Sequence, residues 1–354
     1  MEAGGSAPEG LWLSPGFVDL QLNGFAGVDF SDPALEPEQA ASVLPAVLAT
    51  GTATFCPTII TNTPEALARS FRVLEDARRA SPAFARAAPC YHLEGPYVSP
   101  GGARGVHNPA WMRAPDWDEF ARLQGCAGNR IGIVTVAPEL PGASAFIARA
   151  ARAGVIVSIG HTDGGPEDIH RAAEAGAGMS THLGNGCPGL IDRHRNPLWA
   201  QMADDRLHAG IICDGFHLPA DVVRVILRAK GVERIFLVTD ASHVAGLPPG
   251  PYQLAGTDIE LLPSGKVIKA DGTCLAGSAL SMDRAVGKFM ELSGASLAGA
   301  VRAAAANPAR LLGRPEVCSA IEAGQPANLV LFRLQDGMPR VEAVYSAGEK
   351  SYGN

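Results

Sequence analysis

Two histidines follow two neighbouring strand-like runs of the chain. The apolar run 155–159 leads through Gly160 to His161, and the run 178–181 leads directly to His182. A helix-length segment joins the two runs, which predicts a strand–helix–strand unit whose strands are parallel and end side by side. Two imidazoles at adjacent strand ends can reach one metal ion.

Further polar residues stand at the ends of other strand-like runs. Taken singly, a histidine there is more often a hydrogen-bonded structural group, and an aspartate is more often a turn or helix-capping residue. Their joint placement on one rim favours a functional site instead. These residues are Gln21, Asn23, Glu94, His217 and Asp240.

Glu94, His161 and His182 together offer one carboxylate and two imidazoles. Three protein ligands with a fourth position open are typical of a catalytic rather than a structural zinc site. Such a metal lowers the pKa of a bound water to about 7. Asp240 could then take a proton from the water and deliver it to a leaving group. The set predicts metal-assisted hydrolysis.

The elements that would carry these residues alternate between strand and helix eight times. This alternation predicts an α/β fold of the (βα)8, or TIM, barrel type, in which catalytic side chains lie at the C-terminal ends of the strands. We expect the barrel over residues 14–310, with a β-hairpin insert at about 250–274, and a small, reduced β appendage from 1–13 and 315–354. The expected strands are 17–22, 51–58, 89–93, 131–136, 155–160, 178–182, 207–213 and 234–238.

Composition limits the classes of partner. The 354 residues are 47% hydrophobic and 18% charged with a net charge of −7, which favours one large domain and argues against binding to nucleic acid. No signal peptide is visible, and no apolar run approaches the roughly 18 to 20 residues that cross a bilayer. Seven scattered cysteines are typical of reduced thiols. We therefore expect a cytoplasmic protein without a membrane partner.

Short motifs occur in order along most of the chain. They are PGFVDLQLNG at 15–24, HLEGP at 92–96, GHT at 160–162, THLGN at 181–185, DGFH at 214–217, VTDA at 238–241 and LAGS at 275–278. Together they resemble the N-acetylglucosamine-6-phosphate deacetylase family of the amidohydrolase superfamily over roughly residues 14–349. The resemblance implies hydrolysis of N-acetylglucosamine 6-phosphate to glucosamine 6-phosphate and acetate, by a homodimer.

The resemblance also assigns roles to residues. It implies Glu94, His161 and His182 as ligands of one divalent metal, with zinc as the first choice and iron or another divalent ion as alternatives, and Asp240 as the general acid/base. Gln21 and Asn23 replace the histidines that bind a second metal in many amidohydrolases, which favours a single ion. The implied substrate contacts are Val106, His107, Asn185, Gly186, Arg193, His217, Ala276, Gly277 and Ser278.

The substrate assignment has alternatives. Arg193 is the natural phosphate partner, but a solvated loop arginine is the competing interpretation. The segment after His182 also departs from the family pattern, with Gly184, Gly186 and Cys187 where an aromatic residue and Ala-Met are usual. A deacylase of another N-acyl amino sugar or of an N-acyl amino acid remains open, as does a non-catalytic sugar-binding barrel.

Overall fold

The computed structural model describes residues 10–353 apart from 255–256, 273, 315–320 and 323. Its centre is a sheet of eight parallel strands in the order β11-β10-β9-β8-β7-β6-β5-β2. The strands are β2 (Phe17–Leu22), β5 (Thr52–Ile60), β6 (Tyr91–Glu94), β7 (Ile131–Val136), β8 (Ile156–Ile159), β9 (Ala177–Ser180), β10 (His208–Ile211) and β11 (Ile235–Leu237).

The sheet closes on itself just beyond β11. The backbone N–H of Asp240 donates to Gln21 O (3.0 Å), and the N–H of Asn23 donates to Ala241 O (2.9 Å). Leu22 and Ala241 form a parallel bridge. Because the first strand thus meets the segment that follows the last, the expected (βα)8 barrel is confirmed.

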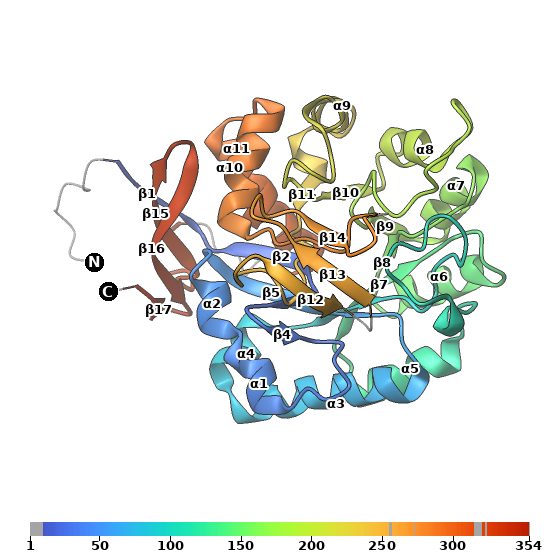
Figure 1. Ribbon diagram of the computed structural model, residues 1–354, viewed down its shortest axis with the longest axis horizontal. Coiled ribbons are helices and arrows are strands. Elements are labelled where there is room, and N and C mark those ends of the chain that lie inside the picture. Colours follow the sequence, from blue (N-terminus) through green and yellow to red (C-terminus); the bar gives the residue numbers. More distant parts are fainter. Residues whose placement is uncertain (1–9, 255–256, 273, 315–320, 323, 354) are drawn as a thin grey trace.

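Helices surround the barrel (Figure 1). The longest, α3, begins where Thr63 Oγ1 accepts the N–H of Ala66 (3.3 Å), with Pro64 in its first turn. The helices are α1 (Pro37–Ser42), α2 (Leu44–Leu48), α3 (Pro64–Ala80), α4 (Pro82–Ala87), α5 (Trp117–Cys126), α6 (Ala143–Arg152), α7 (Pro166–Ala175), α8 (Pro197–Ala203), α9 (Ala220–Lys230), α10 (Met282–Ser293), α11 (Leu297–Val301) and α12 (Asn307–Leu311), with a π-helical turn at Arg302–Ala306 between the last two.

A four-stranded antiparallel sheet lies beside the barrel, on the left of Figure 1. Its order is β1-β15-β16-β17, from β1 (Leu11–Pro15), β15 (Leu329–Gln335), β16 (Met338–Ser346) and β17 (Glu349–Tyr352). We call this sheet the appendage. Phe332 of the appendage packs against Phe17 of the barrel, with ring centroids 6.2 Å apart. The N-terminal strand therefore does pair with the C-terminal strands, while the domain limits given above stay a prediction.

The insert after β11 has three strands, not the two of a hairpin. β13 (Thr257–Leu261) pairs with β12 (Gly250–Leu254) on one side and with β14 (Val267–Lys269) on the other. The third strand forms because the turn at 262–266 returns the chain antiparallel to β13, so that Val267 lies opposite Leu261. The insert buries Leu254, Ile259 and Leu261 in a small apolar cluster of its own. No described helix has the length and apolar character needed to span a membrane.

Candidate metal centre and active site

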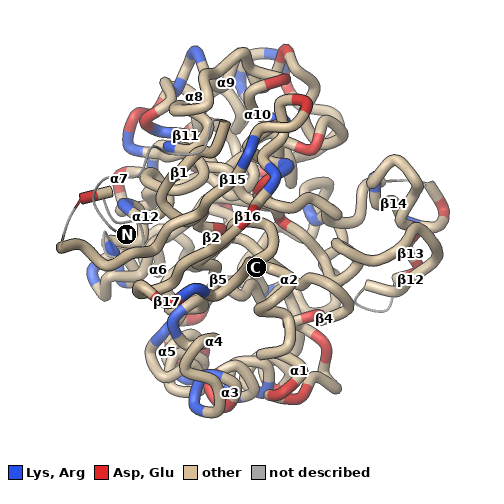
Figure 2. Tube along the Cα trace, turned by 90° about the vertical axis from the view of Figure 1, so that its left-hand side faces the viewer, with Lys and Arg blue, Asp and Glu red and all other residues tan. Residues whose placement is uncertain are grey.

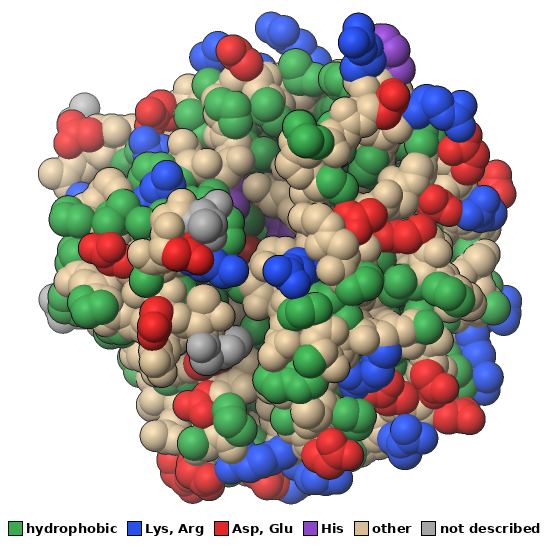
Figure 3. All heavy atoms as spheres, turned by 45° about the vertical axis from the view of Figure 1, so that its right-hand side comes forward, with side chains coloured by type: hydrophobic (Ala, Val, Ile, Leu, Met, Phe, Trp, Pro, Cys, Tyr) green, Lys and Arg blue, Asp and Glu red, His purple; other side chains and the backbone are tan. Residues whose placement is uncertain are grey.

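A pocket of about 250 Å³ opens at the C-terminal ends of the barrel strands. Figure 3 shows it as a hollow in the surface with histidine side chains on its floor. Residues from different strand ends line it, including Glu94 at the end of β6, His161 after β8, His182 after β9 and Asp240 after β11. The barrel thus brings together the residues that the sequence placed on one rim.

Three ligand-type atoms form a tight triangle on the pocket floor. Glu94 Oε1 lies 3.2 Å from His161 Nε2 and 3.1 Å from His182 Nε2, and the two Nε2 atoms are 3.1 Å apart. Ligand atoms about 2.0–2.2 Å from one tetrahedral ion are themselves about 3.3–3.5 Å apart. The triangle is therefore close to the size that a single metal ion requires.

The hydrogen bond of His161 also fits a metal ion. His161 Nδ1 donates its hydrogen to Ala103 O (2.9 Å), so Nε2 of the neutral ring carries a lone pair. That lone pair faces the Glu94 carboxylate and the second imidazole, an arrangement that is repulsive unless a cation lies between them. All three side chains are buried, which raises the cost of leaving the repulsion uncompensated.

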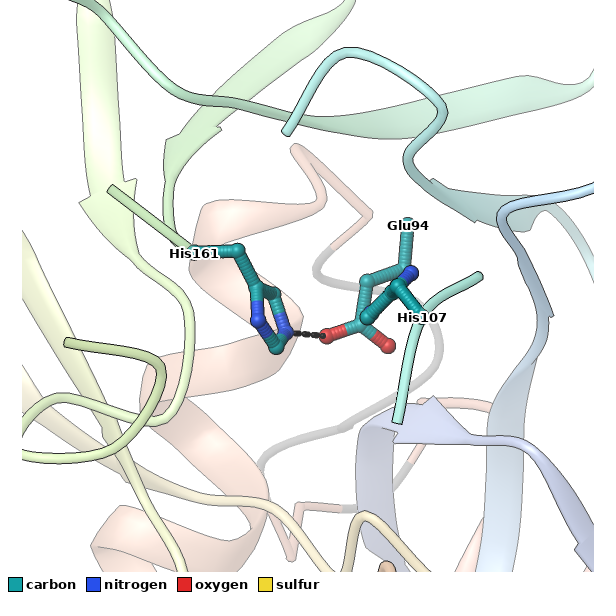
Figure 4. Close-up of side chains that lie close together, drawn as sticks. All are labelled: Glu94, His107 and His161. Carbon is teal, nitrogen blue, oxygen red and sulfur yellow. Dashed lines mark hydrogen bonds and ion pairs between the residues drawn. The ribbon is translucent and has the colours of Figure 1, made fainter. Parts of the chain in front are cut away.

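His107 is the competing third ligand. One of its nitrogens lies within 4.8 Å of the ligand atoms of Glu94 and His161, and the three side chains point toward one another in Figure 4. However, His107 Nδ1 already bonds to Thr61 Oγ1 (2.6 Å), whereas His182 Nε2 approaches both other ligand atoms to 3.1 Å. The shorter distances favour His182 as the ligand and leave His107 beside the metal position.

Burial and charge set the electrostatics of the floor. Burial alone would raise the pKa of Glu94, but the adjacent imidazoles of His161 and His182 hold it well below its ordinary value. Burial lowers the pKa of His107 to about 3, so His107 is neutral at physiological pH. Glu94 is thus an anion, as a metal ligand must be.

Asp240 is held by the two amides of the first strand. Its Oδ1 accepts hydrogen bonds from Gln21 Nε2 (2.9 Å) and Asn23 Nδ2 (2.7 Å). Gln21 Nε2 also donates to Glu94 Oε1 (2.7 Å). Burial, with the nearby charge of Glu94, raises the pKa of Asp240 to about 6. A carboxyl group with a pKa near neutrality is suited to taking up and returning a proton.

Most of the expected substrate contacts line the pocket, namely Val106, His107, Asn185, Gly186, His217 and Gly277. His217 is oriented by Asp214, whose Oδ2 lies 2.6 Å from His217 Nδ1. Ala276 and Ser278 do not line it: Ser278 is buried behind Asp240, where its Oγ donates to Thr239 O (2.5 Å). Arg193 is exposed on the loop after β9 and is not part of the pocket lining.

Sequence reasoning missed residues that act through others. Asp163 accepts from Ser99 Oγ (2.6 Å) and from the N–H of Ala103 (3.0 Å), so it fastens the loop whose carbonyl orients His161. Its position two residues after His161 was the available signal. Asp29, Ser31, Ser242 and Cys274 line the pocket as well, but no motif pointed to them.

Comparisons with known proteins identify the family of the chain. The amidohydrolase family model matches residues 12–350. N-acetylglucosamine-6-phosphate deacetylase of Homo sapiens is 34% identical over 352 residues, covering 96% of this chain and 83% of that protein. N-acetylgalactosamine-6-phosphate deacetylase of Escherichia coli O157:H7 is 32% identical over 339 residues, covering 95% and 87%.

A similar structure is that of N-acetyl-D-glucosamine-6-phosphate deacetylase from Mycobacterium smegmatis, a mutant in complex with N-acetyl-D-glucosamine-6-phosphate. It has a TM-score of 0.88 and 33% identity, covering 98% of this chain and 91% of that one. The resemblance found in the motifs thus extends to the whole fold. The chain belongs to the N-acetylglucosamine-6-phosphate deacetylase family within the amidohydrolases.

Proposed function

We propose that this protein removes the acetyl group from N-acetylglucosamine 6-phosphate, giving glucosamine 6-phosphate and acetate. The observation that carries the proposal is the triangle of Glu94 Oε1, His161 Nε2 and His182 Nε2, with Asp240 in the same pocket. A deacetylase needs a metal position and a proton carrier close to one amide bond, and this pocket supplies residues for both.

A divalent metal held by Glu94, His161 and His182, which we propose to be a single zinc ion, would polarise the amide carbonyl and activate water. Asp240 takes the proton that the attacking water loses and delivers it to the departing nitrogen, which leaves as an amine. Gln21 and Asn23 hold Oδ1 of Asp240, so its Oδ2 is left for this transfer. Their amides add no imidazole ligand for a second metal.

The remaining pocket residues position the sugar. His107 and His217 offer ring nitrogens to hydroxyl groups or to the amide oxygen, and each ring is oriented by a hydrogen bond on its Nδ1 side, to Thr61 and Asp214 respectively. Asn185, Gly186 and Gly277 allow close approach of a polar ligand to the backbone. We propose that Val106 adds an apolar contact and that Ala276 and Ser278 act by holding the wall behind Asp240.

Acetate release from N-acetylglucosamine 6-phosphate by the zinc-loaded protein tests this function. We expect turnover in the wild type and a loss of about 10²–10⁴-fold in Asp240→Asn, because the amide cannot carry the proton. Unchanged zinc content in Asp240→Asn would show that the loss is chemical. The proposal fails if wild-type protein with one bound zinc releases no acetate from this substrate.

The position of Arg193 supports a second candidate, a deacylase for another N-acyl amino sugar. Because Arg193 is exposed and outside the pocket lining, its contact with a sugar phosphate is only a proposal. Rates on N-acetylglucosamine 6-phosphate, N-acetylgalactosamine 6-phosphate and unphosphorylated N-acetylglucosamine separate the candidates. Equal rates with and without the phosphate, or full activity in Arg193→Ala, would favour the second.

We also propose that the protein is a cytoplasmic homodimer. Leu190 (96% exposed) lies in the loop after β9 and Trp199 (50% exposed) in α8, and exposed apolar side chains of this kind suit coverage by a second subunit. Light scattering should then give twice the chain mass of 36.7 kDa. A mass equal to that of one chain would reject the dimer.

A further inference from the structure

A second cavity lies at the opposite end of the barrel from the catalytic pocket. Its volume is about 490 Å³, and it opens where the N-terminal ends of the strands meet the appendage. The barrel contributes Thr54 at the start of β5, and the appendage side contributes Asn328 and Ser346. Figure 2 looks onto this side of the molecule, where Lys and Arg segments lie around β17 and α3. We call it the junction cavity.

Four arginines line the junction cavity. Arg78 lies in the last turn of α3, Arg86 in α4, Arg130 just before β7 and Arg314 after α12. Arg78 and Arg86 lie in consecutive helices, whereas Arg130 and Arg314 come from distant parts of the chain, so the fold brings the three segments together. A guanidinium group keeps its charge under all physiological conditions, and the cavity therefore collects four fixed positive charges.

Few carboxylates balance these charges. Glu75, with a side chain 12% exposed, accepts from Arg130 Nη1 (2.8 Å) and lies 3.8 Å from Arg78 Nε. Glu349 pairs with Arg86 at 3.2 Å, but its side chain is 76% exposed, so this pair is largely solvated. Burial lowers the pKa of Arg78, and the charge of Arg130 lowers it further. The region near Arg78 thus has an excess of positive charge.

A purely structural role explains only part of the cluster. Arg78 donates to Ala85 O (2.8 Å) and to Ala88 O, where it holds the end of α4, and Arg130 pairs with the buried Glu75. Arg314 has no comparable task, since its side chain has no hydrogen bond or ion pair with any described residue. Because no carboxylate of the described residues pairs with Arg314, its guanidinium group is a donor available to a ligand.

We propose that the junction cavity is a binding site for a small organic phosphate, separate from the catalytic pocket. The planar forks of Arg86 and Arg314 suit the oxygens of a phosphate group, and the volume falls in the range of sites for small metabolites. Because the walls come from the barrel and from the appendage, the bound anion links the two. Binding therefore stabilises the folded protein against heat.

Thermal unfolding of the metal-loaded protein tests the site, with inorganic phosphate as the probe and chloride at equal ionic strength as the reference. The variants are Arg314→Gln and, should that fold poorly, Arg86→Gln. Arg228→Gln in α9 is the matched control, because Arg228 is exposed and lies far from the cavity lining. Phosphate bound in the catalytic pocket would act equally on all variants, so the difference between variants isolates the junction cavity.

We expect phosphate to raise the unfolding temperature of the wild type and of Arg228→Gln above the chloride reference. In Arg314→Gln the apparent Kd for phosphate should rise about tenfold, the effect of one lost charge-assisted contact. Equal phosphate shifts in Arg314→Gln and Arg228→Gln would overturn the proposal, as would a wild-type shift that chloride reproduces. Neither outcome bears on deacetylation, which the acetate assay tests separately.

Discussion

His161, His182 and Asp240 share an unusual backbone conformation. Their φ angles are 48°, 30° and 49°, and they are three of the seven described non-glycine residues with positive φ. L-residues adopt this region rarely and at a cost of about 1–3 kcal/mol. All three lie just past a strand end, so the turn redirects each side chain into the pocket. The concentration of this strain on the proposed metal and proton-transfer residues supports their roles.

Gly186 gives the metal ligands their space. It has φ of 58°, and a Cβ there would lie 3.0 Å from both His161 Nδ1 and His182 Cε1. We therefore expect Gly186→Ala to displace the imidazoles and to lower zinc affinity by about 10–100-fold. Competition with a chelator measures the affinity. Gly189→Ala is the control, because a Cβ at Gly189 meets nothing within 4 Å. Unchanged affinity in Gly186→Ala would contradict the ligand positions.

The sequence predicted residues that follow strands but not those that act across loops. His161 and His182 could be placed together because each follows a strand that is recognisable in the sequence, and parallel strands end on one face of the barrel. The hydrogen bond from His161 Nδ1 to Ala103 O joins residues 58 positions apart, and no sequence motif indicated it. Arg193 was expected at the substrate because arginine suits phosphate, yet residue type does not determine the path of a loop.

At the scale of elements, the loop between β6 and α5 is fastened by one carboxylate. Asp163 Oδ2 accepts from Ser99 Oγ, and Asp163 Oδ1 accepts from the N–H of Ala103. We expect Asp163→Ala to release the loop, so that amide hydrogen exchange rises at 99–105 while the barrel strands stay protected. Zinc affinity should fall as well, because the carbonyl of Ala103 no longer orients His161. Asp192→Ala, on an exposed loop, serves as the control, and equal exchange in both variants would reject this role.

Lys230 gives the folded protein a predictable dependence on pH. Its ammonium group, at the end of α9, is buried and donates to Asp204 O (2.6 Å). Burial lowers the pKa of Lys230 from 10.5 to about 8. The unfolded chain therefore binds more protons than the folded one between these values, and this residue's contribution to stability rises with pH across that window.

Lys230→Met removes this dependence. We compare the free energies of unfolding of the wild type and of the variant. As the pH increases from about 8 to 10.5, the value for the wild type should rise relative to that for the variant by up to about 3 kcal/mol. Urea unfolding of both proteins across this range measures the difference. A difference that stays constant with pH would show that the Lys230 pKa is not lowered by folding.

Helices and strands were easier to predict from the sequence when they were long and carried local signals such as caps and periodic apolar residues. The segment 64–80 forms α3, and its capping threonine, the proline in its first turn and its apolar residues at helical spacing are local signals of a helix. α5 has only ten residues, and its burial of Phe120 and Leu123 depends on packing that the sequence does not show. β14 has three residues and is held by its register with β13 and by a bridge from Ile268 to Leu275.

At the scale of the molecule, the alternation of strand and helix predicted the barrel because each parallel crossover allows one arrangement of its strands. Closure depends on the contact between Gln21 and Asp240, 219 positions apart, and this contact also brings the first-strand amides to the proton carrier. The junction cavity could not be predicted, since its arginines come from segments that only the assembled barrel brings together and its far wall comes from the appendage.

Metal content per chain is the measurement that tests the central claim most directly. After loading with zinc and removal of excess metal, wild type and His107→Gln should each hold one zinc per chain, whereas His182→Gln should hold almost none. Acetate release from N-acetylglucosamine 6-phosphate, measured on the same samples, should be absent in His182→Gln. Loss of zinc in His107→Gln with retention in His182→Gln, or two zinc ions per wild-type chain, would contradict a single metal held by Glu94, His161 and His182.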